Sequence, residues 1–314
     1  MGHDAAALTM IALVVACEAS PSVTRLDAAP EAAPSASAST TMAEPPIVHP
    51  SFDAGGRTEI ELPTVRCDDL GQVGWSKVFP PATWKVNVTK ELLALDDPPS
   101  QLRAYVGPYS TVLGPPGLRC RGWYGSSGQW LEVAPPEGVE EDPYRRGPEG
   151  EVIMLNESYW YTSGRFRCAR LASRVFPTLR GRAKEVYDGY HGLSAVDGFT
   201  TNPYPGEFVS VEDRFASYVD PPRVSGIAKE GAWVTPNEDP IHGAMVHWQG
   251  LDPRRASMLV LAVRLRAERE PLVAAVVADF EQRMRTCSQD DDCFGLAGLP
   301  RCFDGTEDDP ARCP

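Results

Sequence analysis

The sequence lacks the short motifs by which many enzymes are recognised. It has no G-x-S-x-G nucleophile elbow, no P-loop, no G-x-G-x-x-G, no H-E-x-x-H and no C-x-x-C. Basic residues are few, because 30 Lys and Arg stand against 43 Asp and Glu, and the net charge of −13 argues against nucleic acid as a partner. No cofactor is predicted, and the sequence by itself indicates no biochemical activity.

A short apolar run lies near the N-terminus. Residues 5–16 read AAALTMIALVVA, a length typical of the core of a secretory signal and too short to cross a membrane. The four residues Val14-Val15-Ala16-Cys17 resemble the lipobox of bacterial lipoproteins. This resemblance implies cleavage before Cys17 and a lipid on Cys17, although the first ten residues contain no Lys or Arg. The alternative is a buried apolar segment with a free thiol.

The composition changes directly after this run. Residues 18–46 are rich in Ala, Pro and Ser, so they cannot bury enough apolar surface to offset the entropy of ordering them. We therefore expect an exported protein of the cell envelope, membrane-anchored or secreted. The predicted segments are a signal segment at 1–16, a disordered tether at 17–50, a globular domain at 51–286 and a cysteine-rich acidic tail module at 287–314.

Eight cysteines indicate disulfide chemistry. Exported proteins meet an oxidising compartment, where disulfides are the default. In the globular domain we expect a bond between Cys120 and Cys168. If Cys17 is lipidated, seven cysteines remain and one thiol is free or paired between chains. The late cysteines are expected to pair among themselves: Cys287, Cys293, Cys302 and Cys313.

The whole chain is 42% hydrophobic, enough for a core. In the globular domain, predicted strands broken by a few helices favour an α+β fold made mostly of antiparallel strands. The near-continuous apolar run at 257–265 predicts a buried central strand, and helical spacing of apolar residues predicts a helix over 270–285. Residues 151–161 fit either a strand or a short helix. Alternating or aromatic-rich runs predict a hairpin at 117–136 and strands at 57–65, 102–107, 207–222 and 243–250.

Four short segments, in this order, resemble motifs of an uncharacterised group of secreted bacterial proteins, mostly from actinobacteria. They are residues 117–120, 168–177 and 220–226 and the pair Asp279-Phe280. The group has no established activity, so the resemblance, over about residues 100–282, implies fold context alone. It also implies that apolar packing at Val263 and Val273 stands in for a bond between two further cysteines of the group.

Residues 165–184 contain seven bases, and the first acid, Glu185, follows them. One interpretation is a patch for anionic lipid headgroups or acidic glycans. The other, which we favour because charge runs are usually solvent-facing, is the solvated face of a helix with Leu171, Val175 and Leu179 on its apolar side. The bases are Arg165, Arg167, Arg170, Arg174, Arg180, Arg182 and Lys184.

The weak catalytic candidates are histidines and their neighbours. His191 lies near Ser194 and Asp197, a nominal Ser-His-Asp set, although triads usually converge from distant segments. His242 and His247 lie five apart, which places them on opposite faces of a strand. We therefore predict no metal site and favour ordinary edge or surface histidines.

The tail has seven acids and two bases. Oxygen-rich clusters suit calcium, but the spacing does not match an EF-hand, and a solvated acidic tail is favoured. The tail is too small for its own core, so disulfides would have to hold it. The acids that calcium would use are Asp290, Asp292, Asp304 and Asp308.

The leading hypothesis is a non-enzymatic envelope protein with a binding or scaffolding role at the cell surface. Its partners would be the membrane, through a lipid on Cys17, and an extracytoplasmic protein or glycan. The alternative is an envelope hydrolase that uses His191 or His242. A third hypothesis makes the tail the working part and the globular domain its carrier.

Overall fold

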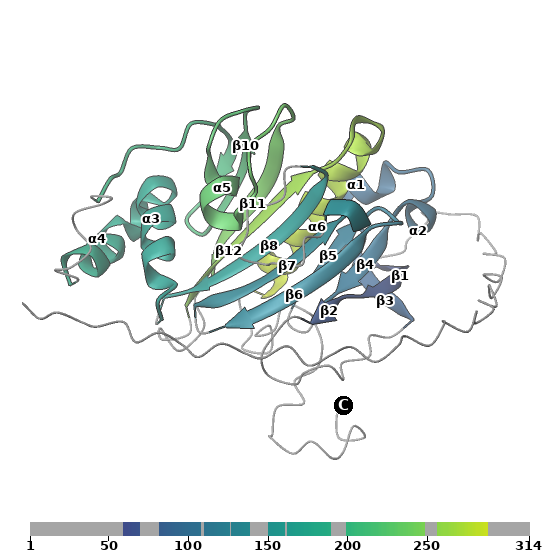
Figure 1. Ribbon diagram of the computed structural model, residues 1–314, viewed down its shortest axis with the longest axis horizontal. Helices are drawn as coiled ribbons and strands as arrows, with labels where there is room; N and C mark the ends of the chain where they lie inside the picture. Colours follow the sequence, from purple (N-terminus) through teal and green to yellow (C-terminus); the bar gives the residue numbers. More distant parts are fainter. Residues whose placement is uncertain are drawn as a thin grey trace, which may run out of the picture. The chain divides into compact units, whose positions relative to one another are not determined.

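The structure is a computed structural model and describes residues 59–69, 82–107, 110–125, 127–138, 150–160, 162–189, 199–248 and 256–287. All of them belong to one compact unit, Ser51–Pro314 (Figure 1). Its strands are β1 (Glu59–Arg66), β2 (Asp68–Asp69), β3 (Thr83–Asn87), β4 (Arg103–Val106), β5 (Thr111–Gly114), β6 (Arg119–Gly125), β7 (Gly128–Ala134), β8 (Val152–Tyr159), β9 (Glu207–Val211), β10 (Phe215–Asp220), β11 (Ile241–Trp248) and β12 (Ser257–Arg264). Its helices are α1 (Lys90–Leu93), α2 (Pro98–Gln101), α3 (Arg165–Val175), α4 (Arg180–Asp188), α5 (Ile227–Ala232) and α6 (Glu270–Cys287).

The main sheet has eight strands in the order β2-β6-β7-β8-β12-β11-β10-β9 (Figure 1). Its neighbouring strands are antiparallel except β2 and β6. The predicted α+β class with mostly antiparallel strands is confirmed. So are the hairpin, which is β6 and β7 with Gly125 opposite Gly128, and the buried central strand, which is β12.

Within residues 151–161, which fitted either a strand or a helix, Val152–Tyr159 form strand β8. This strand is hydrogen-bonded to β7 on one side and to β12 on the other, and all eight of its residues are buried. A strand covered on both faces shows no polar alternation, which is why its period was ambiguous. Residues 207–222 form two strands, β9 and β10.

The two faces of the main sheet carry separate apolar cores, because successive side chains of a strand point to opposite faces. In β8, Val152 and Met154 belong to one core, and Ile153 and Leu155 to the other. The first core also contains apolar residues of α3 and α5, and we call that side of the sheet the α3 face. The second contains residues of α6 and of a smaller sheet, β3-β1-β4-β5, and we call that side the α6 face.

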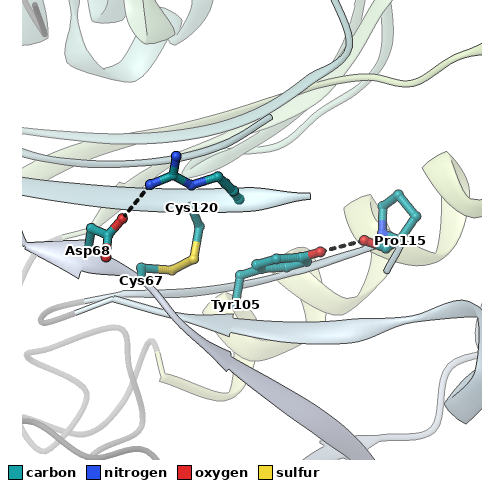
Figure 2. The surroundings of a disulfide bond; sticks show 6 residues. Cys67, Asp68, Tyr105, Pro115 and Cys120 are labelled. Atoms are coloured by element: carbon teal, nitrogen blue, oxygen red, sulfur yellow. Dashed lines mark hydrogen bonds and ion pairs between the residues drawn. A yellow bond between two sulfur atoms is a disulfide. The ribbon is translucent and has the colours of Figure 1, made fainter. Parts of the chain in front are cut away.

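A disulfide joins the two sheets, between Cys67 at the end of β1 and Cys120 on β6. Figure 2 shows it between the ion pair of Asp68 with Arg119 and the hydrogen bond that Tyr105 donates to the Pro115 carbonyl. The expected bond between Cys120 and Cys168 is therefore wrong. Cys120 lies in the core of the α6 face and Cys168 in the core of the α3 face, so the sheet separates them.

Cys168 is a buried free thiol on α3 whose Sγ donates to the Ser158 carbonyl at 3.1 Å. Val263 and Val273 are 0% and 5% exposed and share one core.

The basic run at 165–184 does not form one helix. Phe176 has φ −110° and ψ 102°, an extended conformation typical of a residue before proline, and Pro177 begins a short 3-10 turn. The chain therefore bends between α3 and α4. The strands β2, β3 and β5 and the short helices α1, α2 and α5 were not predicted from the sequence.

Candidate functional site

The histidines on β11 lie on opposite faces of the sheet, as their spacing predicted. His242 is opposite Val263 on the α6 face, and its Nε2 is 3.6 Å from a carboxylate oxygen of Glu270, the first residue of α6. His247 is opposite Met258 on the α3 face. They therefore cannot act on one ligand together, and the described residues contain no group of three metal-binding side chains.

His247 is a buried histidine held neutral by its surroundings. Its side chain packs edge-on against Trp160, with ring centroids 5.9 Å apart. Burial lowers the pKa of His247 to about 4, and the positive charges of Arg182 and Arg214 act in the same direction. A histidine with this pKa carries no charge at neutral pH and adds no cation to the α3 face.

Several candidates from the sequence lie outside the described residues. These are Cys17, the set His191, Ser194 and Asp197, the tail acids Asp290, Asp292, Asp304 and Asp308, and the tail cysteines Cys293, Cys302 and Cys313. Cys287 is the last residue of α6, and its side chain is likewise outside the description. The predictions about these residues stay predictions.

Several bases of the 165–184 run are held by groups within the fold. Arg170 and Arg174 pair with Glu230 at 2.6 and 3.6 Å. Arg174 also lies over the ring of Tyr204, and Lys184 pairs with Asp188. The apolar residues Leu171 and Val175 are buried, as the helix interpretation requires. Much of this run is neither a free basic patch nor a purely solvated helix face.

Arg167 on α3 differs from these neighbours. Its guanidinium donates to Ser158 Oγ at 3.2 Å and to Asn156 Oδ1 at 3.5 Å, both on β8. It also lies 3.9 Å from the centre of the Trp233 ring. Within the described parts of the chain, no carboxylate lies within ion-pairing distance of Arg167. We call Arg167, Trp233, Asn156 and Ser158 the Arg167 site.

Partial burial of the charged Arg167 guanidinium carries an unfavourable desolvation free energy. Burial lowers the pKa of Arg167 to about 10. Ser158 Oγ also donates to Asn156 Oδ1 at 3.2 Å, so these two polar groups satisfy each other without Arg167. A desolvated cation without a counter-charge destabilises a fold. The carboxylate of Glu230 acts on Arg167 through space, but it is already paired with Arg170 and Arg174.

Trp233 supplies an exposed aromatic surface beside this cation. It ends α5 at φ +59°, a left-handed conformation that bulky residues rarely adopt, and 37% of its surface is exposed. Strained residues of this kind often mark functional sites. The helix is held in place because Asp220 accepts hydrogen bonds from its first two N–H groups and Gly231 lies against Val260 of β12.

The strand register continues the site across the sheet. Asn156 lies opposite Trp130 of β7, and Trp130 lies opposite Trp123 of β6. Trp130 belongs to the core of the α3 face, and the half-buried Trp123 packs against that core. The Arg167 site therefore lies beside a row of indole rings. A cation, hydrogen-bonding groups and aromatic rings suit binding of a ligand that carries both an anionic group and a ring.

The sequence contained a signal for this site but could not resolve it. The basic run includes Arg167, yet nothing in the run distinguishes it from Arg170 or Arg174. Trp233 was not predicted as a site residue, because its distance from α3 along the chain hides their contact. Among the described helices, none is long and apolar enough to cross a membrane. The chain matches no protein-family model, no curated protein and no solved structure.

Proposed function

We propose that this protein is a non-enzymatic exported envelope protein with a binding or scaffolding role at the cell surface, anchored through a lipid on Cys17. The observation that carries the proposal is the disulfide between Cys67 and Cys120, which fastens the small sheet to the main sheet. Bonds of this kind persist in oxidising, extracytoplasmic compartments. The signal-like run, the lipobox-like residues and the Ala/Pro/Ser-rich tether support the same location.

The intact mass of the protein, extracted with detergent from its own host, tests this proposal. We expect a mass that begins at Cys17 and includes acyl chains, with Cys67 and Cys120 protected from alkylation until reduction. A Cys17→Ser variant should lose the acyl mass and leave the membrane fraction. An unprocessed chain with alkylatable Cys67 and Cys120 would contradict both the anchor and the export.

An envelope hydrolase is the second candidate, and one observation favours it. The imidazole of His242, about 30% exposed in its side chain, lies 3.6 Å from the Glu270 carboxylate, and a carboxylate beside histidine is an arrangement that general bases share. Assays on cell-wall and ester substrates with His242→Ala and His191→Ala variants test this candidate. Activity that disappears in a folded variant would replace the binding role with a catalytic one.

A further inference from the structure

We propose that the Arg167 site binds the carboxylate of an acidic sugar in an envelope glycan, with the guanidinium of Arg167 as the anion-binding group and Trp233 as the surface on which the sugar ring packs. The glycan's location rests on the envelope role proposed above. The binding itself rests on the geometry of the site and is measured independently of location.

The first argument is the balance of charge on the α3 face. Arg121, which lies over Trp130, has the Glu132 carboxylate at 2.8 Å, and Arg170 has Glu230 at 2.6 Å. Arg167 also lies over a tryptophan, but the carboxylate that acts on it, that of Glu230, is paired with Arg170 and Arg174. An incoming carboxylate would restore the pattern of the neighbouring arginines. Guanidinium groups bind carboxylates through two parallel hydrogen bonds, which gives both strength and orientation.

The second argument is the ring beside the cation. Trp233 is the only large aromatic residue among the strongly exposed apolar side chains of the described residues. It is held by Arg167 on one side and by the end of α5 in a strained conformation. A sugar presents an apolar C–H face that packs on an indole, and an acidic sugar carries its carboxylate directly on the ring. Arg167 lies over one part of the Trp233 ring, so the exposed remainder of the indole is the surface left for the sugar.

The third argument separates a binding role from a structural one. If Arg167 served to hold the fold together, its removal would lower stability. Its hydrogen-bond partners Ser158 and Asn156 bond each other, however, so they are not left without partners. Replacement of an unpaired, partly buried cation by an apolar side chain of similar length is expected to leave stability unchanged or to raise it. Stability sacrificed at one residue is typical of a ligand site.

The test uses the purified full chain and calorimetric titration with two probes, a galacturonic acid tetramer and a hyaluronan tetramer. The methyl ester of the galacturonate tetramer is the matched ligand control, because it keeps the sugar and removes the charge. We expect saturable binding of at least one acidic probe, weaker binding at high salt and none of the ester. Arg167→Met should weaken binding by about tenfold or more without a lower melting temperature. Lys184→Gln, which removes one charge from the exposed surface of α4, should bind as the wild type does.

Three results would overturn the proposal. They are no binding of either acidic probe, equal binding of the acid and its ester, and an Arg167→Met variant that keeps its affinity or melts at a lower temperature. Phosphatidylglycerol vesicles are a further arm, and binding of vesicles without binding of the tetramers would assign the anion to a lipid and also overturn it. A protein that binds the tetramer but fractionates with the cytoplasm would contradict the envelope role alone.

Discussion

A β-carbon placed on Gly226 would lie 2.1 Å from the Oδ1 atom of Asp220. Asp220 is buried at the end of β10, and its carboxylate oxygens accept hydrogen bonds from the N–H groups of Ile227 and Ala228 at 3.1 and 2.7 Å. The carboxylate occupies space that only a glycine leaves free, and it sets where α5 begins. Through α5 this contact also places Trp233.

The close approach predicts that Gly226→Ala lowers the free energy of unfolding by about 2–4 kcal/mol, because the methyl group must displace a buried carboxylate or the start of the helix. Urea denaturation measures the change. Gly181→Ala on α4 is the matched control, since nothing lies within 4 Å of its added carbon, and it should be neutral or stabilise by up to about 1 kcal/mol. Equal stability of G226A and the wild type would contradict the contact.

The disulfide predicts a large effect of Cys67→Ala combined with Cys120→Ala. The bond closes a loop with a sequence separation of 53 residues, and loss of this restraint on the unfolded chain should cost about 4 kcal/mol. Denaturation of the oxidised proteins gives the value, and a non-reduced peptide map should contain the two cysteines in one linked species. A peptide that links Cys120 to Cys168 would show that the pairing described above is incorrect.

Burial of neutral His247 predicts a pH-dependent stability. The folded protein holds the His247 pKa at about 4, below the ordinary 6.5, so the unfolded chain binds the proton first as the pH falls. Stability present above pH 6.5 is therefore lost between about pH 6.5 and pH 4, by about 3 kcal/mol in all. His247→Gln should remove this loss in urea denaturations across that range.

The comparison of wild type with the His247 variant isolates one group. Burial raises the pKa of Asp220 to about 6, which gives a slope of the opposite sign, because the folded state then holds that proton more tightly than the unfolded chain. This contribution is present in both proteins and cancels in their difference. Parallel stability curves for the two proteins would mean that His247 does not titrate as its burial requires.

Glu157 on β8 predicts a pH dependence of stability opposite in sign to that of His247. Burial raises its pKa, and the Ser257 hydroxyl and the Gln129 amide, which donates to it, act the other way. A carboxyl group with a raised pKa contributes stability at low pH that is lost as the pH rises through its folded value. Glu157→Gln should therefore be more stable than the wild type at pH 8, and this advantage should shrink toward pH 4. Thermal melts at both pH values measure it, and an advantage that grows toward pH 4 would refute the assignment.

Hydrophobic periodicity and turn residues were enough to predict the elements whose sequences contain them. The hairpin of β6 and β7, the central strand β12 and the helix α6 carry several periods of apolar residues or a glycine turn, and each was predicted from them. The spacing of His242 and His247 likewise determined that they face opposite sides. Because periodicity is a property of consecutive residues, the α+β class could be inferred without any knowledge of how the elements pair.

Only the tertiary structure decided which residues meet across the sheet. It separated Cys120 from Cys168 by placing them on opposite faces and joined Cys120 to Cys67 instead. It gave Arg170 a carboxylate partner and left Arg167 against Trp233, although both arginines lie on the same helix. Such contacts join residues far apart along the chain, and burial decides which charges lose their solvent. A sequence pattern contains neither the long-range contacts nor the burial of each charge.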